Sequence, residues 1–409
     1  MKPQERRILI VTSFGHFMTH CNMLIFSAVV LPLVSHLNLS MAQVIELSFW
    51  MYLLYGFTSL PWGLVADRLG ARPLMLLFFL GAGLSALLAA YWMDSPARLS
   101  LALAGMGLFT GIYHPAGLGL VSKGIERMSL AMGYHGMFGN LGLALAPLLA
   151  GVCNWLWGPR SVYLATGILN LTGLGLVWTL SLKEPESETE LSAAKGNNGL
   201  FQTFVILLVA MALAGIAYRG CTVVLPAYFE LKNQGILQAL SALWGKDISP
   251  NLVATTITSL IYLVGILGQY AGGVVAERYE PRHSYFTFHA FSMVAVFLMA
   301  VSHDVPLVLL ALIYFFFLFG TQPIENTLVA RFAPKRLHHS AFGIKGVVTF
   351  GVGALAVKMV GGIQNTWSIE ATFIALGIVS LLLLVTVVLL IQRTNARQRN
   401  RLILNSKGF

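Results

Sequence analysis

The sequence predicts an all-α membrane protein in which twelve transmembrane helices form two pseudo-symmetric six-helix bundles. The first observation is composition: the chain of 409 residues is 57% hydrophobic and only 10% charged, whereas soluble domains carry roughly a quarter charged residues. The second is that long apolar runs recur from Ile8 to Leu390, and such runs can cross a hydrocarbon core of roughly 30 Å as helices. The third is an internal repeat, which relates the two halves of the chain.

Only helices and closed barrels satisfy every backbone hydrogen bond in lipid. The sequence lacks the alternation of polar and apolar residues that is typical of barrel strands, so we expect helices. The first apolar run is too long for the hydrophobic region of a signal peptide, and no small-residue cleavage site follows it, so we expect it to remain as the first helix. The predicted spans are 8–34, 43–66, 73–93, 97–121, 130–153, 161–182, 201–229, 252–276, 284–302, 305–330, 340–362 and 370–391.

Basic residues indicate how the chain is oriented in the membrane. Twelve spans place both termini on one side, and the segments on that side hold most of the 26 Lys and Arg residues. The loops on the other side hold only Arg98, Arg160, Lys232 and Lys246. The positive-inside rule therefore predicts an inner-membrane protein with both termini in the cytoplasm. The net charge of +10 is explained by orientation and lipid headgroups, so we expect no nucleic-acid partner.

A polar segment divides the chain nearly in half. Glutamates alternate with other residues from Glu184 to Glu190, in a stretch that also contains Gly and Asn and is typical of a solvated linker. The expected organisation is an N-terminal six-helix bundle at 1–183, a cytoplasmic linker at 184–200, a C-terminal six-helix bundle at 201–392 and a basic cytoplasmic tail at 393–409.

Two motifs recur in the second half. GLVADRLGAR at 63–72 returns 210 residues later as GVVAERYEPR at 273–282, and VVLP at 29–32 returns 194 residues later at 223–226. The longer loop after the seventh span, 230–250, accounts for the difference, and we predict a short amphipathic segment there, outside the membrane. Parallel repeats are one transporter architecture, with the substrate site between the halves near the middle of the membrane.

The motif between spans 2 and 3 resembles the signature of the major facilitator superfamily. Its first copy has Gly63, Asp67, Arg68, Gly70 and Arg72, and its second keeps Gly273, Glu277, Arg278 and Arg282 but has Glu280 in place of the usual glycine. The resemblance covers the whole chain and implies alternating access by rocking of the halves. In this interpretation Gly63 lets neighbouring helices approach closely. The charged residues of both copies then form a conformational gate on the cytoplasmic side.

The fifth span carries a series of small residues and a proline at defined spacings. The series Gly133, Gly142, Ala146, Pro147 and Gly151 resembles the antiporter motif of this superfamily's exporters, with alanine at two of its glycine positions. Small residues at these intervals leave one helix face bare for tight packing, and the proline supplies a bend. The resemblance implies that the protein exports its substrate.

Local sequence around two histidines gives a narrower resemblance. Tyr113-His114-Pro115 and Tyr134-His135 are similar to the corresponding region of fosmidomycin-resistance-type exporters. The match is local, and Ala116 stands where that family commonly has a carboxylate.

Ionisable side chains inside the spans are the candidate site, because each costs about 2.5–3.5 kcal/mol at mid-bilayer. The candidates selected from the spans are His16, His20, His114, His135, Arg219, Glu325, Lys345 and Lys358. The family resemblance implies that spans 1, 4, 7 and 10 line the cavity, with 5 and 11 close behind, so most of this set is expected to meet at the centre. Glu325 neutralises at most one of the three fixed cations. An organic anion is therefore the expected substrate, and Arg219 is its best ligand because a guanidinium matches carboxylate or phosphonate.

Proton coupling needs a group that changes charge within the working pH range. Histidine does so without perturbation, and Glu325 does so if it is desolvated, so the expected carriers are His114 and Glu325, followed by His20. The predicted function is a proton-coupled antiporter that exports a small organic anion or drug. The alternative is proton-coupled uptake of a carboxylate-type metabolite. Transition-metal transport is less favoured, because Arg219 and Lys345 would repel a cation.

The remaining predictions concern what the protein lacks. No Ser/His/Asp arrangement, Gly-rich phosphate loop or paired-carboxylate arrangement is found, so we expect neither an enzyme nor a cofactor. The three cysteines are scattered and predict neither disulfides nor a metal site. We expect a monomer whose partners are its substrate, protons and the lipid bilayer.

Overall fold

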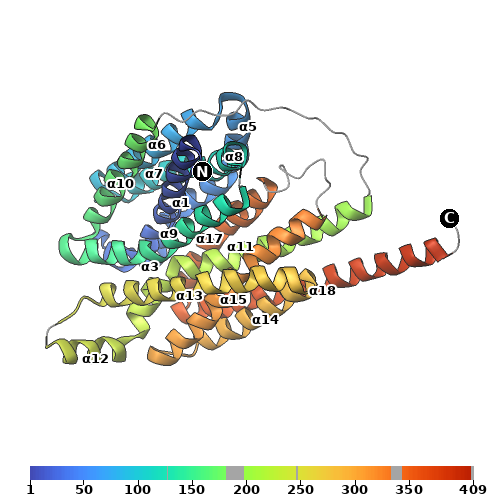
Figure 1. Ribbon diagram of the computed structural model, residues 1–409. Coiled ribbons are helices and arrows are strands. Elements are labelled where there is room, and N and C mark those ends of the chain that lie inside the picture. The colour runs from blue at the N-terminus through green and yellow to red at the C-terminus, as the bar shows by residue number, and fades with distance from the viewer. Residues whose placement is uncertain (127, 181–197, 246, 333–342, 407–409) are drawn as a thin grey trace.

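The fold was analysed in a computed structural model, which describes residues 1–126, 128–180, 198–245, 247–332 and 343–406 (Figure 1). All secondary structure in these residues is helical. The elements of the first half are α1 (Pro3–Ala28), α2 (Val30–Leu37), α3 (Met41–Glu46), α4 (Phe49–Phe57), α5 (Ser59–Leu69), α6 (Ala71–Tyr91), α7 (Pro96–Thr110), α8 (Tyr113–Gly124), α9 (Met128–Trp157) and α10 (Pro159–Thr179).

The second half begins beyond the linker, which lies outside the described residues except for its last three positions. Its elements are α11 (Asn198–Lys232), α12 (Gln234–Trp244), α13 (Pro250–Arg278), α14 (Pro281–Met299), α15 (Asp304–Phe332), a π-helical turn η2 (Val347–Gly351), a 3₁₀ turn η3 (Val352–Ala354), α17 (Leu355–Thr366) and α18 (Ile369–Ser406).

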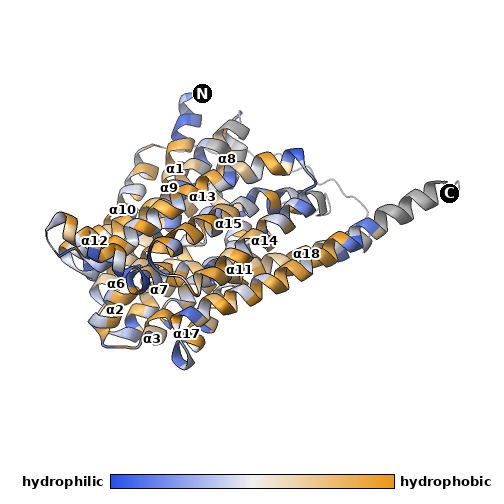
Figure 2. Cartoon of the chain, turned by 90° about the horizontal axis from the view of Figure 1, so that it is seen from below, coloured by the Kyte–Doolittle hydropathy of each residue, from blue (hydrophilic) through white to orange (hydrophobic). Residues whose placement is uncertain are grey.

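The helices form the predicted all-α membrane fold. Among the described residues, nine helices are long and apolar enough to cross a membrane, or ten if the pair Val30–Leu37 and Met41–Phe57, bent by 113°, is one span. The fourth predicted span is broken into α7 and α8, and the ninth is α14. The structure is therefore compatible with twelve spans, and hydrophobic residues recur along the helices (Figure 2).

Two boundaries differ from the prediction in an informative way. The first span is divided at Val29, whose φ of −116° interrupts the helix between α1 and α2. His36, which we expected in a loop, therefore lies in the last turn of α2. The amphipathic segment predicted after the seventh span is present as α12, which buries none of its residues.

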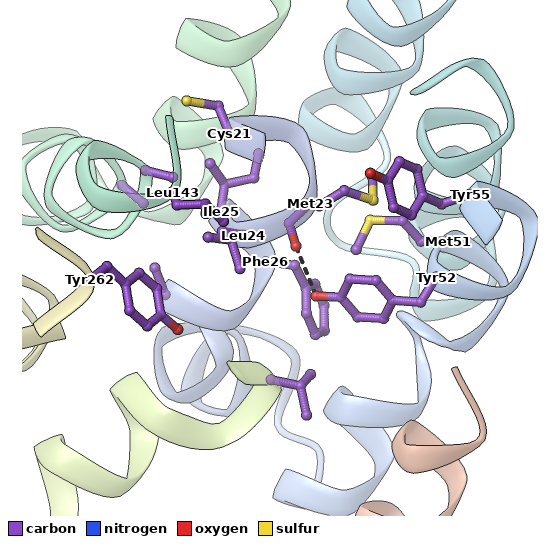
Figure 3. Close-up of a cluster of buried hydrophobic side chains, with 14 of the residues drawn as sticks. Cys21, Met23, Leu24, Ile25, Phe26, Met51, Tyr52, Tyr55, Leu143 and Tyr262 are labelled. Carbon is purple, nitrogen blue, oxygen red and sulfur yellow. Dashed lines mark hydrogen bonds between the residues drawn. The ribbon is translucent and has the colours of Figure 1, made fainter. Parts of the chain in front are cut away.

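Helix α1 lies at the junction of the two halves. Its side chains from Cys21 to Phe26 pack between Tyr52 of α4 and Tyr262 of α13 (Figure 3). The hydroxyl of Tyr52 donates a hydrogen bond to the Met23 carbonyl, with 3.0 Å between the oxygens. Because Tyr52 and Tyr262 are both almost fully buried, α1 is enclosed by helices from both halves at this level.

The two halves are joined on one side of the membrane. We call the face at which α1 begins the N-terminal face, and the face that carries α3 and α12 the opposite face. Asn251 donates to the Ala28 carbonyl at 2.8 Å and accepts from the Asn154 amide at 3.0 Å. Lys358 lies 3.4 Å from the carboxylate of Glu46. These contacts tie the first half to the second near the opposite face.

The two copies of the repeated motif lie on the N-terminal face and differ in backbone. Gly70 ends α5 with a φ of +83°, which favours glycine. Glu280, its counterpart, has a φ of −65°, so a side chain is tolerated there. Arg282 donates to Glu280 at 2.9 Å and to Asn395 of α18 at 3.3 Å. Those contacts remain within the second half, and the role of the motif as a gate stays a prediction.

Candidate functional site

Three helices of the first half bring four histidines together. His16 and His20 are one turn apart on α1 and therefore share a helix face. His114 lies in the first turn of α8, just after the break that follows α7, and His135 lies on α9. We call His16, His20, His114 and His135 the histidine cluster.

Hydrogen bonds fix the orientation of His16. Its Nδ1 lies 2.9 Å from the His135 carbonyl oxygen, so Nδ1 carries a proton and donates it. Nε2 of the neutral ring is then an acceptor, and it lies 3.2 Å from Nε2 of His20. Space for the ring comes from Gly139 of α9, where an added Cβ would overlap the His16 imidazole.

Tyr113 holds the His135 ring in the same way. The Tyr113 hydroxyl donates to the Thr12 carbonyl of α1 and lies 2.5 Å from Nε2 of His135. A hydroxyl has a single proton, so it accepts the hydrogen bond from His135. The rings of His16 and His135 stack with 4.2 Å between their centroids. The cluster is therefore a pre-ordered set of imidazoles and not a group of independent surface histidines.

Arg219 of α11 is the charged group of the second half that faces this region. It is 3% exposed, and its guanidinium carbon lies 3.7 Å from the ring centroid of Tyr52, as in a cation–π contact. Its Nη1 has no hydrogen-bond partner in the protein. A buried guanidinium with an open donor is a ready site for an anion.

Glu325 and Lys345 form a separate ion pair, which we call the carboxylate pair. Lys345 Nζ lies 3.2 Å from Glu325 Oε2, and the two side chains are 16% and 5% exposed. The Tyr285 hydroxyl donates to Glu325 Oε1 at 2.7 Å, and Lys345 also donates to Asn326 at 2.6 Å. Both charges are therefore satisfied within the second half.

The π-helical turn of span 11 connects this pair with the histidine cluster. Phe350 of η2 lies parallel to the His114 ring, with 6.2 Å between centroids, and 5.3 Å from the ring of Tyr55. Gly56 of α4 packs directly on the backbone of Gly351. Lys345 is five residues before Phe350 on the same span. A short stretch of chain thus separates the carboxylate pair from the contact with His114, and π turns frequently mark functional sites.

The predicted site residues therefore separate into two groups. The four histidines lie together in the first half, and Arg219 of the second half lies over Tyr52. Glu325 and Lys345 satisfy each other. Lys358 pairs with Glu46 near the opposite face. In the sequence analysis, two of the three candidate cations had no carboxylate to pair with. In the structure, Arg219 is the candidate whose described contacts include no carboxylate.

Sequence reasoning missed three contributors. His289 of α14 is 2% exposed, its Nε2 has no hydrogen-bond partner, and its ring meets that of Tyr285 edge-on at 4.5 Å. His289 lies inside a predicted span, so the rule that selected the other histidines applies to it as well. Tyr285 and Tyr52 carry no charge, and their contacts with Glu325 and Arg219 depend on tertiary packing.

The small residues of the fifth span lie at helix–helix contacts. An added Cβ at Gly142 would overlap the Phe17 backbone of α1, and one at Gly151 would overlap Thr255 of α13. Ala146 is fully buried, and Pro147 lies inside α9. Gly133 is also on α9, but its surroundings fall outside the described residues. The series therefore packs α9 against helices of both halves.

Comparison with known proteins agrees with this architecture. The model of the major facilitator superfamily matches residues 12–357 and 233–406. The chain belongs to the major facilitator superfamily. Among relatives of this superfamily member, the multidrug efflux pump Tap of Mycolicibacterium fortuitum is 26% identical over 362 residues, which cover 80% of the chain and 82% of the pump. The class B tetracycline resistance protein of Escherichia coli is 29% identical over 172 residues, which are 39% of the chain and 42% of that protein.

Solved structures of transporters share the fold of this superfamily member. The inward-facing, occupied structure of a bacterial homolog of the human lysosomal transporter Spinster aligns with a TM-score of 0.76 and 14% identity, and the alignment covers 96% of this chain and 98% of that one. The superfamily member is therefore a multi-pass membrane transporter, as the sequence predicted.

Proposed function

We propose that this transporter is a proton-coupled antiporter of the inner membrane that exports a small organic anion or an anionic drug. Export is supported by the spacing of small residues on α9 and by efflux proteins among the relatives. We further propose a monomer with both termini in the cytoplasm and with its two six-helix halves rocking about the bound substrate.

The observation that carries this proposal is the environment of Arg219. A buried guanidinium without a carboxylate is costly, and an anion that accepts from Nη1 removes that cost. The site lies between α11 of the second half and α4 of the first half. A substrate bound there contacts both halves, which is what alternating access requires.

Protons have two candidate carriers in this scheme. The histidine cluster lies on the first-half side of Arg219, and Glu325 lies in the second half with Lys345 and Tyr285. Proton binding to Glu325 breaks its ion pair with Lys345, and the strain passes along span 11 to Phe350 and His114. In this scheme the conformational gate closes the N-terminal face when the substrate site is open to the opposite face. The charged residues of the gate are Asp67, Arg68, Arg72, Glu277, Arg278 and Arg282.

Proton-coupled uptake of a carboxylate-type metabolite is the second candidate. The argument that favours it is electrostatic. A protonated imidazole near Arg219 strengthens anion binding, so a proton and an anion would bind together and cross the membrane in the same direction. The two candidates differ in the direction of proton movement when substrate is added.

Substrate recognition is tested with Arg219→Gln in proteoliposomes. A charge-assisted hydrogen bond contributes about 1.5–3 kcal/mol, so the apparent affinity for a transported organic anion should fall roughly 10- to 100-fold. Arg160→Gln removes an exposed arginine that pairs with Asp94, and it serves as the charge-matched control with unchanged affinity. Equal affinity of wild type and Arg219→Gln for the anion would remove Arg219 from the binding site.

A further inference from the structure

Part of the histidine cluster has the arrangement of a metal site. One ring nitrogen from each of His16, His20 and His114 lies within 4.8 Å of those of the other two. The three residues are of intermediate burial. Three neutral imidazoles are ligands suited to Zn²⁺, Co²⁺, Ni²⁺ or Cu²⁺, whereas Mg²⁺ and Ca²⁺ prefer oxygen ligands.

The spacing of two ligand atoms already fits a tetrahedral ion. A Zn–N bond is about 2.0–2.1 Å, so two nitrogens at tetrahedral positions are about 3.3 Å apart. Nε2 of His16 and Nε2 of His20 are separated by 3.2 Å. Nε2 of His114 is buried and has no hydrogen-bond partner, so closing the third position costs no existing hydrogen bond.

The surroundings of His16 give independent support. Metal-binding histidines donate their second ring N–H to a carbonyl or carboxylate, which fixes the tautomer and the ring orientation. Nδ1 of His16 does this with the His135 carbonyl, and Gly139 leaves room for the ring. His16 therefore presents an Nε2 lone pair toward His20 before any ion binds.

We propose that His16, His20 and His114 bind one transition-metal ion of the Zn²⁺ or Co²⁺ class, with a fourth position open to water or an anion. This differs from the sequence-based expectation of no metal site, which rested on repulsion by Arg219 and Lys345. Lys345 is paired with Glu325. Arg219 comes from the other half of the protein and sits over the ring of Tyr52. An anion in the fourth position compensates both the ion and Arg219, so metal and anion bind cooperatively.

The site has a consequence for transport. A metal ion bound by His16, His20 and His114 occupies the ring nitrogen of His114, the expected proton carrier, so we expect Zn²⁺ to inhibit proton-coupled transport. That consequence rests on the proposed function, whereas metal binding itself does not. All three ligands lie on α1 and α8, so the ion is held by the first half alone.

Metal binding is tested by Co²⁺ titration of the full-length protein, purified in detergent through a tag without histidine and stripped with chelator. We expect one Co²⁺ per chain, with the visible absorption of four-coordinate Co²⁺. His16→Ala, His20→Ala and His114→Ala should each weaken binding about 10-fold or more. His283→Ala removes an exposed histidine outside the cluster and should leave Co²⁺ affinity unchanged.

Two results overturn the assignment. One is wild-type protein that shows no saturable one-to-one Co²⁺ binding, a result that needs no variant to fold. The other is a His16→Ala/His114→Ala variant that binds Co²⁺ as tightly as wild type does. Elution from a sizing column would show that this variant is folded. Asparagine replacements serve if the alanine variants aggregate. Tight Co²⁺ binding without inhibition of transport by Zn²⁺ would support the metal site and contradict the proton-carrying role of the cluster.

Discussion

Replacing Glu325 by glutamine isolates the charge of the carboxylate pair. The glutamine keeps the size of the side chain and a carbonyl oxygen that accepts from Tyr285, whose hydroxyl lies 2.7 Å from Glu325 Oε1. The substitution removes the negative charge 3.2 Å from Lys345 Nζ. At an effective dielectric constant of about 20, unit charges at this distance attract by about 5 kcal/mol.

Desolvation offsets much of that attraction, because both side chains are largely buried. Exposed pairs contribute up to about 1 kcal/mol, and breaking a fully buried pair costs about 3–5 kcal/mol. We therefore expect a coupling free energy of about 1–3 kcal/mol between Glu325 and Lys345. Lys345→Met combined with Glu325→Gln should be more stable than Glu325→Gln alone, since no unpaired cation remains.

The assay is a double-mutant cycle on unfolding in detergent, with proton-coupled transport measured on the same four proteins. The matched control is the pair of Glu46 and Lys358, whose side chains are 43% and 50% exposed and lie 3.4 Å apart. Its coupling should be below about 1 kcal/mol. If the Glu325–Lys345 coupling is no larger than that of the control, the two residues are not a buried switch and our reasoning about proton binding fails.

Three further outcomes follow from the backbone and the surface. Gly70→Ala should lower the unfolding free energy by roughly 1 kcal/mol, because Gly70 has a φ of +83°. Glu280→Gly at the equivalent position should not raise the unfolding free energy. Thermal unfolding of both variants checks these two outcomes. Gly151→Val should slow transport with protein levels in the membrane retained, since the larger side chain meets Thr255 of α13; equal transport would contradict tight packing of α9 on α13. Hydrogen bonds from Arg160 and His36 lower the pKa of Asp94 below 3.8, so their stabilising effect is present at neutral pH and lost as the pH falls through that lowered pKa. Asp94→Asn should therefore reduce the melting temperature slightly at pH 7, and the difference from wild type should shrink as the pH falls through the lowered pKa.

The membrane class and the repeat could be recognised from the sequence because both depend on local features of the chain. Long apolar runs need no tertiary information, and the four-residue spacing of His16 and His20 on one helix already places them side by side. The convergence of His114 and His135 on that face was expected only through the family resemblance. Close packing of α1, α8 and α9 produces it, and Gly139 makes the approach possible.

Partner choice was the part that sequence could not determine. From the sequence, Glu325 could pair with Arg219, Lys345 or Lys358. In the structure it contacts Lys345 and the uncharged Tyr285. Lys358 pairs with Glu46, more than 300 residues away in the chain. Pairing across such separations depends on the way the halves pack, and no periodicity encodes it. The result sharpened the substrate argument: of the three candidate cations, Arg219 is the one whose described contacts include no carboxylate.

The direction of proton movement tests the proposed antiport most directly. Purified protein in proteoliposomes with an internal pH indicator is presented with an external organic anion at equal internal and external pH. Antiport predicts that the interior becomes more alkaline as anion enters and protons leave, and that His114→Ala and Glu325→Gln abolish the change while the control His283→Ala, which removes an exposed histidine, does not. Internal acidification by wild-type protein would establish cotransport and contradict export by proton exchange.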